Sequence, residues 1–318
     1  MNRKRFFLLC AAAAVIIVCI MLKVFMYFDY DRAAAKICRT PGLDTEFVPQ
    51  GSGRLAYENT YLFCGYMDNG EPSRIFLVKD GNVKTVKLQN TDGSDYDGHA
   101  GGITCAGEYV YISNAAQIFV INKSDLLAAG DGGTVRFAGS VEVPCRSSFC
   151  SCDGNMLYVG EYHAKGYETD GSHMLGTPDG QQYYALVFAY RISPSGTFGL
   201  DSSSPAAAYS ICDKIQGFAV TPDGRAVLSQ SAEVMKSFLK IYDIKGEADG
   251  EFSSNGKSIP LYYLDSGRFI KDLKMPRMSE DIECVDGKIL VSFEAGASKF
   301  YGNLLPFAEK HSVLVDIG

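Results

Sequence analysis

Acidic side chains at the boundaries of predicted β-strands are the residues of this sequence best suited to chemistry. The adjacent pair Glu280-Asp281 precedes a short apolar strand that starts at Ile282. Glu161 and Glu294 each follow a predicted strand and open a long insertion. Carboxylate oxygens suit a hard cation, and two carboxylates on either side of a glycosidic bond can hydrolyse it.

Two further side chains join this set by their place in the sequence. Gln216 lies in a Gln-Gly dipeptide before the apolar strand that starts at Phe218. His99 stands shortly before the strand that starts at Ile103. Any shared site therefore requires a fold that brings the entrances of several strands together.

A unit of short β-strands, repeated five times, provides such a fold. Each unit consists of an apolar strand, a turn residue, a second strand and a third strand. The first strands start at Leu55, Ile103, Phe149, Phe218 and Ile282, and the turn residues are Asn59, Gly107, Gly154, Gly224 and Gly287. Four units continue into a fourth strand, with the sequences VKTVKL, VRFAGSVEV, AAAYSI and SIPLYYL. Four strands per unit of about 40 to 50 residues predict an all-β β-propeller of five blades, with six as the alternative.

The ends of this repeat predict how the ring closes. The last unit ends at Gly318 without a fourth strand. We expect residues 45–49, which precede the first unit, to fill that place, because closure removes sheet edges that promote aggregation. The propeller domain is therefore expected over residues 45–318, behind a linker of residues 31–44.

In a propeller the first strand of each unit lines the central channel, so the residues before these strands form a ring. The expected ring is Gly53-Arg54, Gly101-Gly102, Ser147-Ser148, Gln216-Gly217 and Glu280-Asp281. The same face receives both insertions, residues 162–182 and 295–310, which Glu161 and Glu294 open from matching positions. Long loops over a rigid ring are where binding and catalysis usually lie.

Three kinds of site compete on this face. The first is a metal site of His99, Glu161, Asp281 and Glu294, with Glu280 in place of Asp281 as a variant, binding calcium rather than zinc because oxygen ligands predominate. The second is a glycosidase that uses Glu161 together with Glu294 or Asp281. The third is a set of polar groups that only solvate the channel mouth.

The N-terminus predicts a membrane anchor. Arg3, Lys4 and Arg5 precede seventeen consecutive apolar residues, 6–22. Seventeen helical residues span about 26 Å, near the lower limit for crossing a bilayer. Residues 1–30 are therefore expected to form a cytoplasmic basic tip and an uncleaved single-pass transmembrane helix, with the propeller outside the cytoplasm. Secretion after cleavage of a signal peptide is the alternative.

The charge of the chain restricts its partners. Beyond Lys36 there are 24 basic and 35 acidic residues, a net charge of −11. This is the wrong sign for nucleic acid and suits a cationic partner. The chain has no Trp, the best platform for stacking a sugar, although Tyr can take that place.

Three segments, GHAGGI with YVYIS, IQGFAV-TPDG-RAVLSQS and MSEDIE-VDG-KILVSFE-AGASKFYG, carry a resemblance. They resemble a group of uncharacterised bacterial secreted or membrane-anchored β-propeller-like proteins with HAGGI-, QG- and PEDL-type turns. The resemblance covers residues 97–301, with Ser279 where that group has proline. It implies a fold and an extracytoplasmic location, and it carries over no catalytic role.

Together these observations predict a membrane-anchored propeller that binds a ligand on its loop-rich channel face. The expected ligand is a small molecule, or a protein or glycan of the cell surface. The expected binding residues are His99, Glu161, Gln216, Glu280, Asp281 and Glu294. The alternative function is a hydrolase on the same face, either a metal-assisted lactonase or a glycosidase with two carboxylates.

Overall fold

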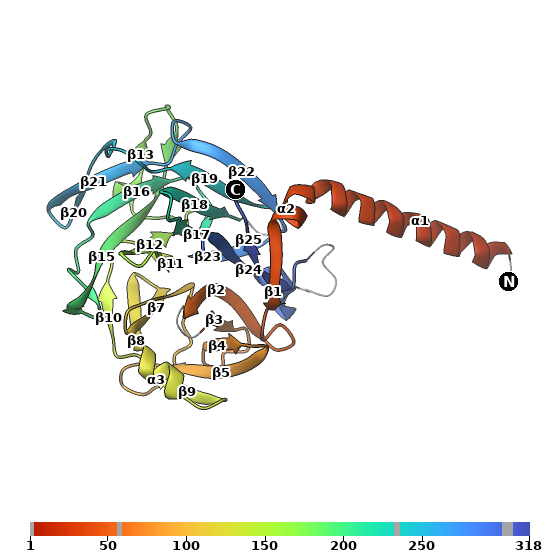
Figure 1. Cartoon of the computed structure of the whole chain (residues 1–318), viewed down its shortest axis with the longest axis horizontal. Coiled ribbons are helices and arrows are strands. Elements are labelled where there is room, and N and C mark those ends of the chain that lie inside the picture. Colours follow the sequence, from red (N-terminus) through yellow and green to blue (C-terminus); the bar gives the residue numbers. More distant parts are fainter. Residues whose placement is uncertain (1–2, 56–58, 232–235, 301–307) are drawn as a thin grey trace.

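The computed structural model describes residues 3–55, 59–231, 236–300 and 308–318. Within them, five sheets of four to six strands are arranged around a central axis (Figure 1), and β13 (Leu175–Gly176) and β14 (Gln182–Tyr183) form a separate two-stranded sheet in an insertion. Each of the five larger sheets is a blade whose first strand lies innermost. The prediction of an all-β propeller with five blades is confirmed.

The blades follow one another along the chain. Blade 1 contains β2 (Phe47–Leu55), β3 (Thr60–Met67), β4 (Arg74–Lys79) and β5 (Asn82–Gln89), and blade 2 contains β6 (Gly102–Ala106), β7 (Tyr109–Asn114), β8 (Gln117–Asn122) and β10 (Gly139–Glu142). Blade 3 begins with β11 (Ser147–Cys152), β12 (Met156–Glu161), β15 (Ala185–Thr197) and β16 (Ala207–Ile211). Blade 4 contains β17 (Ile215–Val220), β18 (Arg225–Gln230), β19 (Ser237–Asp243) and β22 (Phe269–Met275). Blade 5 contains β23 (Ser279–Val285), β24 (Lys288–Phe293), β25 (His311–Val315) and β1 (Ala34–Arg39).

The predicted turn residues all lie between the first and second strands of their blades. Asn59, Gly107, Gly154, Gly224 and Gly287 have φ between 47° and 92°. Glycine and asparagine tolerate this left-handed region best, which explains why these residue types mark the repeat.

The strand that closes the ring is not the predicted one. β1 pairs antiparallel with β25, from Ala34 opposite Val315 to Arg39 opposite His311. Residues 47–49 of the predicted closing segment instead open β2, the innermost strand of blade 1. Phe47 and Val48 are fully buried, which an outermost strand does not allow, whereas β1 is half exposed and carries Lys36 and Arg39 at the edge.

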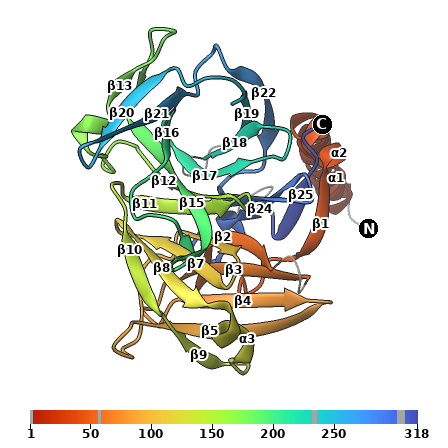
Figure 2. The same ribbon diagram turned by 60° about the vertical axis from the view of Figure 1, so that its left-hand side comes forward.

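Two of the predicted fourth strands also add to unexpected edges. The segment VRFAGSVEV divides into β9 (Gly133–Arg136), which pairs parallel with β5 of blade 1, and β10 of blade 2. The segment SIPLYYL lies in β21 (Lys257–Tyr263), which pairs parallel with β16 of blade 3 and carries β20 (Gly250–Ser254) on its other side (Figure 2). Blade 4 takes β22 as its outer strand in place of β21.

A β-bulge recurs near the start of four of the five innermost strands, all except β6. The register shifts between Pro49 and Gly51, between Ser147 and Phe149, between Ile215 and Gly217, and between Ser279 and Ile282. A bulge re-aims one side chain, here at Gln50, Ser148, Gln216 and Glu280. The ring member of blade 1 is therefore Gln50-Gly51, and the predicted member Gly53-Arg54 lies further along β2.

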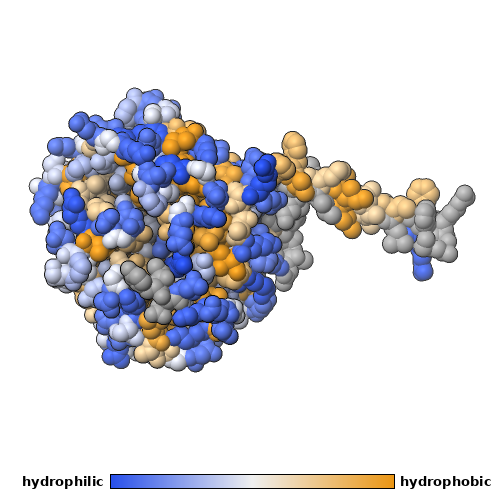
Figure 3. All heavy atoms as spheres, viewed as in Figure 1, coloured by the Kyte–Doolittle hydropathy of each residue, from blue (hydrophilic) through white to orange (hydrophobic). Residues whose placement is uncertain are grey.

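Before the propeller, the chain forms two helices, α1 (Arg3–Met26) and α2 (Phe28–Ala33). α1 projects away from the blades, and its visible surface is more apolar than that of the propeller (Figure 3). α2 returns to the propeller, where Tyr30 is buried against Phe293. Among the residues that the structure describes, no helix is long and apolar enough to cross a membrane, so the predicted transmembrane segment is not supported.

The closing strand can be tested by truncation. A chain that begins at Thr40 lacks β1 and leaves one edge of β25 unpaired. We expect it to aggregate on size-exclusion chromatography and to melt at least about 5 °C lower, because several kcal/mol of strand pairing and packing are lost. A matched chain that begins at Tyr27 keeps α2 and β1 and should behave like the full chain. Equal stability of the two truncated chains would contradict this assignment.

Candidate functional site

Four polar side chains meet at the start of the innermost strands, at one end of the propeller axis: Gln50, Gln216, Glu280 and Glu294. This cluster is called the channel mouth. The first three lie at the bulges of β2, β17 and β23, and Glu294 follows β24 in a short 3-10 helix, η3 (Glu294–Gly296). Gln50 Nε2 donates to Glu294 Oε2 at 3.0 Å, and Gln216 Nε2 donates to Glu280 Oε1 at 3.4 Å. The two carboxyl groups are also hydrogen-bonded to each other.

A hydrogen bond between two carboxyl groups requires a proton on one of them. Burial, followed by the charge of Glu294, raises the pKa of Glu280 well above its usual value. Burial also raises the pKa of Glu294, to about 7, against the opposing effects of Gln50, Glu280 and Lys299. At neutral pH Glu280 therefore keeps its proton, which it can donate in the hydrogen bond to Glu294.

Aromatic and charged side chains form the rim of this mouth. The ring of Tyr66 stacks on that of His99, with centroids 4.8 Å apart and planes at 24°. Lys299 Nζ donates to the Tyr66 hydroxyl at 2.9 Å and pairs with Asp68 at 3.0 Å. His99 as a whole is exposed, but its ring is packed against Tyr66, and this desolvation, followed by the charge of Lys299, lowers the pKa of the imidazole to about 4, so the ring is neutral at pH 7.

Asp281 lies deeper, at the axis of the propeller, and is fully buried. Its Oδ2 accepts a hydrogen bond from the backbone N–H of Ile103 on β6 at 3.2 Å, whereas its Oδ1 has no hydrogen-bond partner among the described residues. Its pKa is raised, first by burial and then by Glu283. The adjacent residues Glu280 and Asp281 thus have different roles. Glu280 belongs to the channel mouth, whereas Asp281 accepts a backbone hydrogen bond at the axis.

Glu161 does not join the mouth. Within blade 3 it lies opposite Ser147, whereas the residue opposite the equivalent Ser279 of blade 5 is Phe293. Glu161 therefore matches Phe293, and Glu294 comes one residue later, so the prediction of matching positions is wrong. A shift of one residue turns a side chain to the opposite face of a strand.

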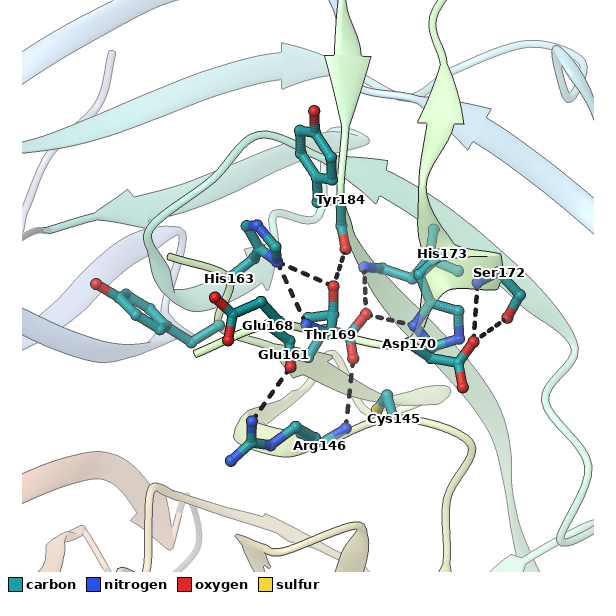
Figure 4. A network of polar contacts seen from close by, with 12 residues as sticks. Cys145, Arg146, Glu161, His163, Glu168, Thr169, Asp170, Ser172, His173 and Tyr184 are labelled. Carbon is teal, nitrogen blue, oxygen red and sulfur yellow. Dashed lines mark hydrogen bonds and ion pairs between the residues drawn. The ribbon is translucent and has the colours of Figure 1, made fainter. Parts of the chain in front are cut away.

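Glu161 instead belongs to a network inside blade 3 (Figure 4). Its Oε1 lies 2.6 Å from Nδ1 of His173 and accepts the N–H of Leu186 at 3.1 Å. Its Oε2 accepts the N–H of Arg146 at 3.4 Å. The four predicted metal ligands do not form one cluster, and no group of three or more His, Cys, Asp and Glu able to hold a metal occurs in the described part of the chain.

Gln50 is a residue of the site that the sequence analysis did not select, although the sequence could have indicated it. Gln50-Gly51 repeats the dipeptide Gln216-Gly217, and this repeat indicates equivalent positions at the starts of two innermost strands. The roles of Lys299 and Glu283 had no such signal, because neither belongs to a repeated motif.

The arrangement favours binding over glycoside hydrolysis at this pair. Glycosidases place their two carboxyl groups about 5 to 9.5 Å apart, with the sugar between them. Glu280 and Glu294 are in direct contact, which leaves no space for a glycosidic bond. What the pair can do is hold a proton near neutral pH and exchange it for a cation.

Comparisons with known proteins show no family for this chain. No protein-family model matches the sequence, and no curated protein matches it. Among solved structures, the chain is similar to the PQQ-bound form of aldose sugar dehydrogenase from Streptomyces coelicolor, with 13% identity and a TM-score of 0.45, over 89% of this chain and 97% of that one. It is also similar to a gluconolactonase from Xanthomonas campestris, with 11% identity and a TM-score of 0.39, over 78% of this chain and 84% of that one. At these values neither likeness bears on function.

The buried carboxyl groups predict that stability falls as pH rises. Burial raises the pKa of Glu283 to about 8, so between its unfolded pKa of about 4.3 and pH 8 the folded state keeps a proton that the unfolded state has lost. The free energy of unfolding should decrease between pH 5.5 and 7.5, by up to about 1.4 kcal/mol per pH unit for each such group. Urea unfolding at several pH values measures this.

The variant Glu283→Gln removes one titrating group and should flatten this pH dependence. The control Glu247→Gln changes an exposed carboxylate and should keep the wild-type slope. A Glu283→Gln slope equal to that of the wild type would mean that Glu283 is ionised in the folded protein.

Proposed function

We propose that this propeller binds a small cationic ligand at the channel mouth formed by Gln50, Gln216, Glu280 and Glu294. The observation that carries the proposal is the hydrogen-bonding contact between two buried carboxyl groups, each of which has a raised pKa. Two carboxyl groups in contact cannot both ionise unless a positive charge lies between them. A bound cation would replace the shared proton, and the ligand would then hold both groups as carboxylates.

The neighbouring groups support a cation in that place. Gln50 and Gln216 now donate their Nε2 hydrogens to the pair, and a flip of each side-chain amide would turn its oxygen, a hard ligand of the kind that calcium prefers, towards the cation. The nearby cationic side chain of Lys299 is paired with Asp68, so its charge is partly compensated by that carboxylate. The rim offers the stacked rings of Tyr66 and His99 to the organic part of an amine.

Either a calcium ion or a protonated amine could supply the positive charge between the two carboxyl groups, and a binding experiment distinguishes these two ligands. A hydrolase on this face stays the second candidate. It rests on Glu294, because a carboxyl group with a pKa of about 7 can act as a general base at neutral pH. The predicted extracytoplasmic location remains a prediction from the N-terminal sequence, and the binding proposal does not depend on it.

Calorimetric titration at pH 6.5 with calcium chloride, and separately with putrescine, tests the proposal. We expect one of them to bind with release of between one and two protons, because Glu280 keeps its proton and the pKa of Glu294 is about 7; the dependence of the heat on the ionisation enthalpy of the buffer measures this number. Below pH 7 the affinity should rise with pH by at least about tenfold per pH unit, because protons compete with the cation.

The double variant Glu280→Gln/Glu294→Gln should lose this binding by more than about tenfold while keeping its melting temperature. The control Glu108→Gln, an exposed carboxylate, should bind as the wild type does. If neither probe binds at millimolar concentration, or if binding releases no proton, the channel mouth is not a cation site.

A further inference from the structure

The ammonium group of Lys299 occupies a defined place at the rim of the channel mouth. Its Nζ donates to the Tyr66 hydroxyl at 2.9 Å and lies 3.0 Å from Oδ1 of Asp68. It also lies 4.8 Å from the centroid of the Tyr66 ring and 6.0 Å from that of the Phe300 ring. A carboxylate, a hydroxyl group and aromatic rings around one nitrogen are suited to bind an ammonium ion. Tyr66, Asp68 and Phe300 are called the ammonium subsite.

The ammonium subsite is open to solvent, and the side chain that fills it is free to leave. The side chains of Lys299 and Asp68 are 37% and 36% exposed. Lys299 lies in the short 3-10 helix η4 (Ser298–Phe300), and its flexible four-carbon side chain can turn into water while the backbone stays in place. An exposed ion pair of this kind contributes little to stability. The ammonium group of a ligand can therefore take the place of Lys299 Nζ at little cost.

The ammonium subsite is next to the carboxyl pair of the channel mouth. Tyr66 on β3 lies opposite Val48 on β2, and Gln50 follows Val48 by two residues, which span about 7 Å of strand. The amide of Gln50 contacts Glu294. Burial raises the pKa of Glu294, and the charge of Lys299 opposes this rise, so the ammonium group lies within electrostatic reach of the pair. One small molecule can therefore contact both places.

The charges of these groups fit a ligand with two separate positive charges. When Glu280 and Glu294 ionise around a cation, they and Asp68 carry three negative charges, against the positive charge of Lys299. A dication brings this set to neutrality. A calcium ion holds both of its charges at one centre, whereas the carboxylates lie in two places. Two ammonium groups joined by a short chain match this distribution better.

We propose that the ligand of the channel mouth is an aliphatic diamine, with one ammonium group at the carboxyl pair and the other in place of Lys299 in the ammonium subsite. Lys299 is then a tethered competitor, which the second ammonium group displaces once the first is bound. The first contact holds the second group at a high effective concentration, so the exchange favours the ligand. The inference rests on the proposed function, since the first ammonium group is the cation described there.

Calorimetric titration of the full chain at pH 6.5 tests this inference. The probes are the diamines putrescine and cadaverine, the monoamines butylamine and pentylamine, and calcium chloride. We expect at least one diamine to bind at least about tenfold more tightly than the monoamine with the same number of carbon atoms, because only the diamine reaches both places.

Asp68→Asn should remove this advantage, so that the diamine and its monoamine bind within about twofold of each other, because the ammonium subsite loses its carboxylate. Asp80→Asn is the matched control, since Asp80 is an exposed aspartate of the same blade, in the turn between β4 and β5. It should keep the advantage of the diamine.

Nuclear magnetic resonance of the lysine side chains gives a second readout. The rings of Tyr66 and Phe300 shift the Cε signals of Lys299, which are assigned by their loss in Lys299→Gln. A bound diamine should move these signals to the position of an exposed lysine, whereas a bound monoamine or calcium should leave them in place. If calcium or a monoamine binds but neither diamine binds more tightly than its monoamine, or if a bound diamine leaves the Lys299 signals in place, the inference is overturned and the proposed function stands. If none of the probes binds at millimolar concentration, both are overturned.

Discussion

The close approach of the five innermost strands at the axis is the constraint on which the rest of this structure depends. β2, β6, β11, β17 and β23 pack directly against one another. A Cβ atom added at Gly102 would lie 2.4 Å from the backbone nitrogen of Cys150, and one added at Gly217 would lie 2.7 Å from that of Ile282. Glycine is required at these contacts, because any side chain would push the blades apart. Asp281 lies fully buried among these strands and joins β23 to β6 through the backbone N–H of Ile103.

This tight axis has an electrostatic consequence. Glu280, Asp281 and Glu283 lie on one innermost strand and are all buried, which raises the pKa of each carboxyl group. The opposing charge of Arg54 acts on Glu283 only weakly compared with burial. The strand therefore holds protons at pH values where free carboxyl groups have lost them. Among these carboxyl groups, Glu280 belongs to the channel mouth, where it contacts Glu294. Burial at the axis raises the pKa of this pair, and the proposed function depends on that raised pKa.

Glu161 and Glu294 each open a long insertion, but their positions relative to the preceding strand differ by one residue. This difference gives them separate roles. Glu294 turns to the axis and meets Gln50 and Glu280, whereas Glu161 turns into blade 3 and orients His173. The two environments differ in kind, since one is a pair of carboxyl groups sharing a proton and the other is a carboxylate held by three donors. The same residue type thus serves a candidate cation site in one blade and the positioning of an imidazole in another.

The sequence by itself determined the five repeated units, the left-handed turn residues and the presence of polar groups at the strand entrances. These features are local, because each depends on strand alternation, turn residues and strand spacing within one repeated unit of about fifty residues. The tertiary structure alone decided that residues 34–39 close the ring, that β9 and β21 add to neighbouring blades, and that Glu161 and Glu294 point to different places. These features depend on which sheet edge is free and on strand register, where a shift of one residue reverses a side chain. The local pattern of a strand specifies neither the free sheet edge nor the register. The candidate residues could therefore be predicted from the sequence, and the residues that they contact could not.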